Sequence, residues 1–474
     1  MKTRDAVTRT IAIIGGGVSG TLTAYHLLRQ NADARVIVID PRPKLGLGLA
    51  YSTPSLRHLL NVPAGKISAL PDEPDHFLDW LRANHDAEAQ PTTFAPRAVF
   101  GRYIHSLAED IGLSQVLAFV VDYRANKTGA VLTLDTGHEL RADFVVLATG
   151  NFDPAALPGI SEEAIKTGAY CHNAWAPETY ENLNPDAPVA LIGTGLTGVD
   201  VVLRLRELGH RGIIAAVSRH GVFPNRHADY VPLDESAIPT ATPPTCVAYL
   251  HAIHTAIRNG ADWRAVIDSL RATTNELWLA LPLHEQKRFR RHLQRRWDVV
   301  RHRMAPPIAE IIDAELKAGT LVIREGHLAA VDATDIGASV VIRTHAGTER
   351  FTAARVINCT GPSMNFRRVG SALLDRLFEQ GLISSGPLGG GFLCASDGAM
   401  IDAPGNVSEG MFNLGPGRLG TLLESIAVPE IRQQAVQLAE LLSEHVREAN
   451  ALDGLATSNV VRRQVEPRVE AVLA

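Results

Sequence analysis

The sequence predicts an α/β fold with two Rossmann-like dinucleotide-binding domains and a helical insertion in the second one. Three observations predict it. A strand-like run, a G-x-G-x-x-G turn and a helical segment occur twice, starting at Ile11 and at Val189. Each copy is followed by another apolar strand, and two further apolar runs, 144–150 and 355–361, both end in Thr-Gly. Strands that alternate with helices in this way favour parallel sheets covered by helices.

The first unit lies within residues 10–41. An apolar run over 11–14 predicts a buried parallel strand, and a second strand over 35–39 ends at Asp40. The turn between them contains Gly15, Gly17, Ser19 and Gly20. Its glycines allow a tight turn, close approach of a pyrophosphate and close packing of helix on strand. Asp40, about twenty residues further on, is placed to accept hydrogen bonds from a ribose diol. Together these features favour a dinucleotide site over an accidental glycine turn.

Length, charge and cysteine usage exclude several classes. A chain of 474 residues suggests two or three domains. A net charge of −5 and 5% aromatic residues argue against nucleic-acid binding. No run of eighteen apolar residues predicts a membrane span, and three consecutive glycines interrupt the only apolar run near the N-terminus that could mimic a signal peptide. No cysteines form C-x-x-C, so we expect neither a redox dithiol nor a metal site, and a cytoplasmic setting.

A long stretch rich in glycine and proline follows Asp40 and extends to about residue 68. Long loops in compact domains are uncommon and often functional. Next to a dinucleotide turn, this loop is well placed to line the rest of the cofactor. Tyr51, Asn61 and Val62 are the candidates for that wall, and a surface loop without such a role is the alternative.

The second unit carries Gly193, Gly195 and Gly198 in the same spacing. The strand that follows ends in Ser218-Arg219 rather than in an acid. An acid at this position suits a free ribose 2′-hydroxyl, whereas an arginine suits a 2′-phosphate. The sequence therefore predicts a second nucleotide site that takes NADPH.

The domain organisation follows from these units. We expect a first domain over 1–185, a second domain over 186–354 with a helical insertion at about 223–307, and a return to the first domain over 355–474. The insertion contains the basic run KRFRRHLQRRWDVVRHR. This run is either a solvated helical face or a source of arginines for an anionic substrate or the NADP phosphates.

The two Thr-Gly ends, at Gly150 and Gly361, are expected to mark crossings between the domains. Near the C-terminus, Gly415 and Gly417 precede a long helix expected over 421–447. The N-terminus of that helix would direct further N–H groups at the first cofactor.

This order of parts resembles the two-dinucleotide-binding-domain flavoproteins. The stretches GLGLAYST, LLNVPAGKIS, FAPRAVFGRYI, WRAVIDSLR and GTLLESIAVPEIR are similar to the FAD/NAD(P)-binding protein family typified by YdhS. The resemblance spans nearly the whole chain and implies FAD at the first site and NADPH at the second. Its wider relatives are the class B flavin-dependent monooxygenases.

Those relatives carry a signature of the form F-x-G-x-x-x-H-x-x-x-W/Y between their two glycine turns. The segment from Lys166 through His172 to Trp175 is similar, although lysine replaces phenylalanine and the tryptophan comes one residue early. The resemblance implies a catalytic role for His172, and a structural histidine between the domains is the alternative. The related disulfide reductases need a cysteine pair, which is absent from this sequence.

The resemblance implies an NADPH-using, FAD-dependent monooxygenase that acts on a small molecule with molecular oxygen. Within this class we expect N-hydroxylation of an amino acid or another polar amine, because arginines of the insertion could bind a carboxylate. The alternatives are an NAD(P)H:acceptor flavin oxidoreductase without oxygenation and a non-catalytic flavoprotein module. Assembly into a homo-oligomer is left open.

Overall fold

The computed structural model describes residues 8–126 and 129–469, with side chains described as far as residue 452. Its first sheet has six strands in the order β16-β17-β7-β1-β2-β3. These strands are β1 (Arg9–Ile14), β2 (Ala34–Ile39), β3 (Gln115–Val116), β7 (Phe144–Leu147), β16 (Ala399–Ile401) and β17 (Val407–Asn413). All neighbours are parallel except β16 and β17. Ile11 pairs with Val36 on one side and with Phe144 on the other, so β1 is a central strand, and its last four residues are buried.

The second sheet has five parallel strands in the order β11-β10-β9-β15-β8. They are β8 (Tyr170–Cys171), β9 (Val189–Ile192), β10 (Ile214–Ser218), β11 (Leu321–Glu325) and β15 (Arg355–Asn358). Two small antiparallel sheets complete the strands. One contains β4 (Val120–Asn126), β5 (Gly129–Leu134) and β6 (Glu139–Ala142), and the other β12 (His327–Thr334), β13 (Gly337–Thr344) and β14 (Gly347–Ala353).

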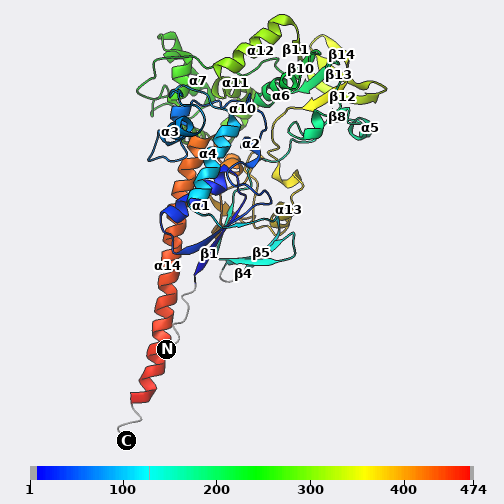
Figure 1. Ribbon diagram of the computed structural model, residues 1–474. Helices are drawn as coiled ribbons and strands as arrows, with labels where there is room; N and C mark the ends of the chain where they lie inside the picture. The colour runs from blue at the N-terminus through cyan, green and yellow to red at the C-terminus, as the bar shows by residue number, and fades with distance from the viewer. Residues whose placement is uncertain (1–7, 127–128, 470–474) are drawn as a thin grey trace.

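Three helices form a layer beside the first sheet. Helix α1 (Val18–Arg29) packs with α4 (Arg97–Asp110) and with the long C-terminal helix α14 (Val428–Val469). Figure 1 shows α14 beside α1 and continuing well past the body of the molecule. The apolar side chains of α14 that pack into this core include Ile431, Leu438 and Leu442. This layer fixes the position of the α1 N-terminus.

The helical insertion of the second domain gathers at one end of the molecule (Figure 1). It consists of α7 (Cys246–Arg258), α8 (Trp263–Ser269), α9 (Thr274–Ala280), α10 (Leu283–His292) and α11 (Gln294–Arg301). Helix α12 (Pro306–Ala318) follows and packs Ile308 and Ile312 against the second sheet. Helix α12 thereby forms the last part of the crossover between β10 and β11. It extends to Ala318, beyond the end of the insertion expected at about residue 307.

Two expectations from the sequence differ from the structure. The boundaries at 185 and 355 do not follow the sheets, because β8 and β15 pair with each other in the second sheet. The similarity of the two Thr-Gly runs is local and does not determine which sheet a strand joins. The C-terminal helix begins at Val428 rather than at residue 421, because a 3₁₀ turn, η4 (Gly415–Gly420), and a short loop precede it.

Candidate cofactor and substrate site

The first glycine turn connects β1 to α1, and two of its glycines are required by packing. Gly15 has a φ of +108°, and a Cβ there would lie 2.3 Å from the carbonyl oxygen of Ala148. A Cβ on Gly20 would lie 1.9 Å from the carbonyl oxygen of Gly15. Neither position accepts a side chain without moving backbone. These two glycines therefore hold α1 close against the strands.

Gly17 is different, because the protein itself leaves room for a side chain there. It is the N-cap of α1 with a φ of −74° and a ψ of −170°, which any residue can adopt. The nearest atom to a Cβ would be the Cα of Gly48, at 3.5 Å, which is an ordinary contact. No side chain caps the helix N-terminus. A glycine at an open, uncapped N-cap suits an anionic ligand that approaches the backbone.

Two buried polar atoms near this turn lack a protein partner. Among the described residues, neither Thr149 Oγ1 nor Asn413 Oδ1 has a hydrogen-bond partner. Thr149 follows β7 and Asn413 ends β17, where its amide nitrogen donates to the Leu147 carbonyl at 2.6 Å. Both therefore lie at the carboxyl ends of parallel strands, where open α/β sheets bind ligands. Together with Gly17, these atoms fit a bound dinucleotide.

Asp40 follows β2 directly, as predicted, but its carboxylate already has partners. Oδ2 accepts hydrogen bonds from the Gly16 amide at 2.7 Å and from the Arg42 guanidinium at 2.8 Å, and Oδ1 accepts two more from Arg42. Burial would raise the pKa of Asp40, but these hydrogen bonds lower it below its ordinary value. The Arg42 side chain is 47% exposed, so it is free to move toward solvent. The predicted contact of Asp40 with a ribose requires that movement.

The loop after Asp40 folds back over the turn. The Gly46 amide donates to the Gly16 carbonyl at 2.8 Å, and a short helix α2 (Gly48–Tyr51) follows. Tyr51 packs on Phe100 with ring centroids 5.0 Å apart, and burial raises its pKa to about 12. Val62 is buried, and the Asn61 carbonyl accepts a hydrogen bond from His227 at 2.9 Å.

Asn61 and Val62 line a cavity of about 1620 Å³ between this loop, the insertion and the start of α14. Its charged lining includes Lys66, Asp229, Asp268, Arg271, Glu276, Arg418, Glu430 and Arg432. Of these, the side chains of Lys66, Asp229 and Glu276 form no ion pair or hydrogen bond in the described part of the chain, whereas Arg418 and Arg432 donate to backbone carbonyls. Tyr51 is not among the lining residues. The cavity thus offers both signs of charge to a polar ligand.

The C-terminal segment joins α1 at η4. Gly415 has a φ of +76°, and a Cβ there would lie 2.4 Å from Ser19 Oγ, so this glycine lies directly against the α1 N-terminus. Its amide donates to the Gln434 side chain at 2.9 Å. A Cβ on Gly417 would meet the Asn413 amide group at 2.5 Å. Gln434 and Arg418 also line the large cavity, so η4 connects the first turn with that cavity.

The second glycine turn repeats the first. A Cβ on Gly193 would lie 2.4 Å from the Cys359 carbonyl oxygen, and one on Gly198 would lie 2.6 Å from the Gly193 carbonyl oxygen. Gly195 is the uncapped N-cap of α6 (Leu196–Glu207), with a φ of −79°, and a Cβ on it would have no described atom within 4 Å. Gly195 therefore corresponds to Gly17, with packing glycines on both sides and open space at the helix N-terminus.

Ser218 and Arg219 lie at the end of β10 beside this turn. Thr194 Oγ1 donates to Ser218 Oγ at 2.9 Å, while Arg219 is exposed. Arg295, from the basic run of the insertion, donates to the carbonyl oxygens of Thr194 and Val222 at 3.3 and 2.6 Å. Burial lowers the pKa of Arg295, and the neighbouring charge of Arg219 lowers it further. Two arginines thus meet at the turn, and the sequence pattern singles out only Arg219.

His172 lies in the loop after β8, away from the residues that line the large cavity. Its Nδ1 is 3.4 Å from the hydroxyl of Tyr170, which also accepts a hydrogen bond from Asn358 at 3.3 Å. Gly150 and Gly361 both have positive φ, and the two connections that begin there meet where the Ser363 amide donates to the Asp153 carbonyl at 3.1 Å. The catalytic role expected for His172 stays a prediction.

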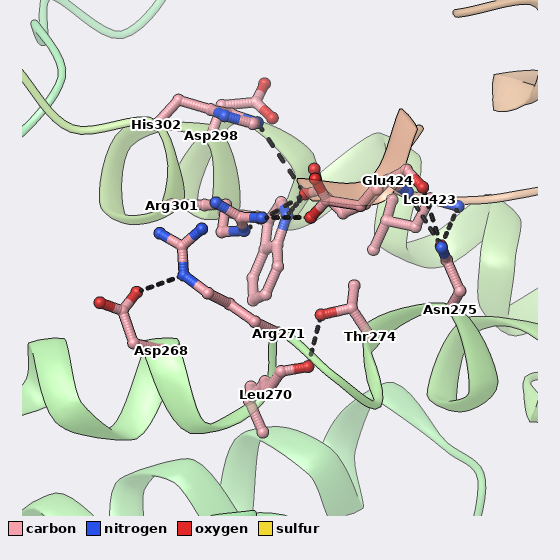
Figure 2. A network of polar contacts seen from close by, with 12 residues as sticks. Asp268, Leu270, Arg271, Thr274, Asn275, Asp298, Arg301, His302, Leu423 and Glu424 are labelled. Atoms are coloured by element: carbon pink, nitrogen blue, oxygen red, sulfur yellow. Dashed lines mark hydrogen bonds and ion pairs between the residues drawn. The ribbon is translucent and has the colours of Figure 1, made fainter. Parts of the chain in front are cut away.

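A buried polar network joins the insertion to the segment between η4 and α14 (Figure 2). Glu424 is central: its side chain accepts a hydrogen bond from Trp297 at 2.8 Å and lies 3.8 Å from Arg301. Arg301 also pairs with Glu430 at 3.0 Å. The Asn275 side chain accepts from the amides of residues 423 and 424 and donates to the Glu424 carbonyl. No sequence pattern signals this network, because its members are far apart along the chain.

Comparison with known proteins agrees with this fold. Residues 12–152 match the model of the FAD-NAD(P)-binding family. The chain is 25% identical over 236 residues to YdhS, an uncharacterised protein of Escherichia coli K12, in a match covering 45% of this chain and 42% of YdhS. It is 27% identical over 217 residues to a Baeyer-Villiger monooxygenase of Streptomyces coelicolor, covering 43% of this chain and 33% of that protein. Each match spans less than half of the relative's length.

Among solved structures, the ornithine N-hydroxylase of Kutzneria sp. 744, with reduced FAD, NADP⁺ and L-ornithine, superposes with a TM-score of 0.61. The identity is 14%, with 92% of this chain and 99% of that chain covered. The fold is therefore that of the flavoprotein reductases and monooxygenases with two dinucleotide-binding domains, which confirms the predicted fold class. Within that class, residues 12–152 match the FAD-NAD(P)-binding family and the chain is similar to YdhS over 45% of its length, which confirms the predicted relation.

Proposed function

We propose that this protein is an FAD-dependent, NADPH-using monooxygenase that N-hydroxylates a small polar amine, such as an amino acid. The observation that carries the proposal is the large cavity beside η4, because unpaired groups of both signs line it in the described part of the chain. Lys66 could hold a substrate carboxylate, while Asp229 and Glu276 could hold ammonium groups. FAD supplies hydride acceptance from NADPH and activation of oxygen when it is bound at the first turn.

The chain's own contribution is binding, orientation and exclusion of water. Gly17 and the α1 N-terminus would hold the FAD pyrophosphate, and Gly195 with Arg219 and Arg295 would hold NADPH. The loop over 46–67 and η4 would cover the flavin end, since both contact the first turn. This arrangement supports a closed reaction site, which oxygenation requires.

The cellular compartment and the partners are also part of this proposal. No helix in the described part of the chain is long and apolar enough to cross a lipid bilayer. The four cysteines are free, which suits a reducing cytoplasm. We expect the partners to be a small-molecule substrate and molecular oxygen, without nucleic acid or membrane, and assembly into a homo-oligomer is open to measurement.

The test is NADPH oxidation by the FAD-loaded protein, measured together with oxygen consumption and hydrogen peroxide release over a panel of amines. L-Ornithine and L-lysine carry a carboxylate, and putrescine and cadaverine are their counterparts without it. A monooxygenase should form hydroxylated amine at the expense of peroxide for at least one of these compounds. Oxygen consumption that ends entirely in peroxide for every amine, with fast reduction of an artificial acceptor, would favour the acceptor oxidoreductase. Negligible NADPH oxidation with any acceptor would favour the non-catalytic module.

A substitution at Lys66 tests whether the large cavity binds the substrate carboxylate. Lys66→Met removes the cation and keeps an unbranched side chain one atom shorter, so KM for a carboxylate-bearing substrate should rise about ten- to a hundred-fold, the loss of one charge-assisted hydrogen bond. KM for the matched diamine should change little. Lys44→Met, at an exposed lysine outside the cavity, is the control. Equal effects on both substrates would argue against Lys66 as a carboxylate contact.

A further inference from the structure

A second cavity, of about 480 Å³, lies inside the helical insertion, and the five helices α7 to α11 contribute to its walls. Trp297 and Leu423 of the Glu424 network line it, whereas Asn275 and Glu430 of the same network line the large cavity. Its volume falls within the range of roughly 300–1,000 Å³ typical of small-molecule sites. The proposed oxygenation does not use it, because its lining shares no residue with the large cavity.

The lining is almost entirely apolar. It includes three tryptophans, Trp263, Trp278 and Trp297, and aliphatic side chains from all sides, among them Ile253, Ile257 and Leu423. Its polar members are mostly occupied by the protein. Thr274 donates to the Leu270 carbonyl at 2.7 Å, and Trp297 donates to Glu424. The interior therefore offers contact surface to an apolar body.

Helix α7 shows that this apolar surface is only partly covered by the protein. Cys246 is its only buried residue, although the helix carries Tyr249, Leu250, Ile253 and Ile257 toward the cavity. Ile257 is 36% exposed. Apolar surface left accessible in a cavity is stabilised when a ligand removes it from water. A helix whose apolar face borders a cavity rather than a core favours an apolar ligand.

Two basic side chains lie at the same cavity. Arg296 and His254 line it, both are exposed, and neither has a side-chain hydrogen bond or ion pair to any described residue. The run from 287 to 296 adds further cations on α10 and α11. In contrast, the acid Glu285, near the start of α10, is buried and is occupied by Arg288 and the Cys246 amide. The polar end of a ligand here would meet positive charge.

From this geometry we infer that the insertion contains a binding site for an amphipathic anion, with an apolar body among the tryptophans and one acidic group at Arg296. A medium-chain carboxylate is the simplest compound of this class. The site is separate from the proposed substrate site, but its wall is joined to the segment after η4. Trp278 Nε1 donates to the Thr421 carbonyl at 3.0 Å, and Leu423 lines the cavity. An occupant would thus pack against the segment that borders the flavin side.

The test is isothermal titration calorimetry of the FAD-loaded full-length protein. Decanoate, butyrate and decanol are titrated separately. Decanoate should bind, whereas butyrate lacks the apolar body and decanol lacks the charge, so both should bind at least about tenfold more weakly. Ile253→Trp fills the cavity and should abolish decanoate binding. Val247→Trp, on the outer face of the same helix and 66% exposed, should not.

A second pair of variants does not depend on a core substitution. Arg296→Gln should weaken decanoate binding about ten- to a hundred-fold and leave decanol unchanged. Arg291→Gln, at an exposed arginine of the same basic run outside the lining, should change neither. The inference is overturned if decanoate does not bind, if Ile253→Trp binds it as the wild type does, or if Arg291→Gln weakens it as much as Arg296→Gln. NADPH oxidation is not needed for any of these measurements, so they are independent of the proposed oxygenation.

Discussion

At the residue scale, the glycines of each turn divide into two kinds. Gly15, Gly20, Gly193 and Gly198 are required by the backbone that surrounds them. Gly17 and Gly195 have ordinary φ values and space for a side chain. The sequence motif predicts all six and assigns the glycines of a turn to turning, ligand approach and packing. The structure shows the atoms that Gly15, Gly20, Gly193 and Gly198 must avoid and the open space at Gly17 and Gly195.

This division gives a reciprocal prediction. Gly17→Ala should weaken FAD binding about tenfold or more, because the new methyl occupies the approach of the pyrophosphate while the protein still folds. Gly195→Ala should leave the flavin content unchanged and weaken NADPH by a similar factor. Flavin absorbance per protein and NADPH titration measure both effects. Full flavin content in Gly17→Ala, with an unchanged melting temperature, would show that the first turn is not the FAD site.

A second prediction at this scale concerns the choice of nucleotide. Arg219 is exposed at the end of β10, and Arg295 lies beside the same turn. Arg219→Ala should raise KM for NADPH about ten- to a hundred-fold and leave KM for NADH nearly unchanged, since only NADPH carries the 2′-phosphate. Steady-state kinetics with both nucleotides measures this. Equal use of NADPH and NADH by the unaltered protein would contradict it.

At the element scale, the strands and turns were the most predictable part. Short apolar runs followed by glycine turns correctly indicated β1, β7, β9 and β15, and an apolar run after the second turn indicated β10. What the sequence could not supply was their partners. Strand β15 resembles β7 in its Thr-Gly end, yet it pairs with β9 and β8 in the other sheet. Pairing depends on which surfaces meet after the chain crosses over, and no local pattern records that.

The insertion is tied to the loop over 46–67 by one titratable contact, which gives a pH prediction. Burial, and then the charge of Arg303, lower the pKa of His227 from 6.5 to about 4. The folded protein then binds fewer protons than the unfolded chain between these pH values. Stability is therefore fully present above about pH 6.5 and falls as the pH drops toward 4.

His227→Gln should reduce the loss of stability between pH 7 and pH 5, because glutamine keeps a donor for the Asn61 carbonyl but does not titrate. Urea midpoints at the two pH values measure the difference. His251→Gln, at an exposed histidine of α7, is the control and should behave like the unaltered protein. A midpoint difference in His227→Gln as large as in the unaltered protein would show that His227 does not contribute to the pH dependence.

At the scale of the whole molecule, the two nucleotide units are joined by a small polar cluster. His58 Nε2 donates to the Asp200 carbonyl at 3.0 Å, and Arg97 forms an ion pair with the Asp200 carboxylate. Trp175 packs edge-on against His58, with ring centroids 6.0 Å apart. Arg97 begins α4 beside the first sheet, and Asp200 lies in α6 of the second unit. The cluster therefore helps to set the position of the second glycine turn relative to the first.

The sequence indicated a cleft between the units but not the residues that hold it. Arg97 and Asp200 are 103 positions apart (200 − 97), and each is an ordinary helical residue in its own segment. Conversely, the segment that was singled out, around His172, contacts this cluster through Trp175. Contacts between two units leave no periodicity in the sequence of either of them, so this part of the site required the structure.

Removing one partner of this pair should loosen the junction. The Asp200 side chain is 9% exposed and that of Arg97 21%, so Arg97→Gln leaves a nearly buried carboxylate unpaired and should cost about 3 kcal/mol of unfolding free energy. The exposed pair Arg124–Glu139 provides the matched control, because Arg124→Gln should cost at most about 1 kcal/mol. The rate of flavin reduction by saturating NADPH, measured by stopped-flow absorbance, should also decrease in Arg97→Gln. The Kd for FAD should stay unchanged. The slower reduction would follow from a less defined distance between the two nucleotides, which both turns otherwise fix. Unchanged reduction, with the same stability loss as in Arg124→Gln, would mean that the junction is held elsewhere.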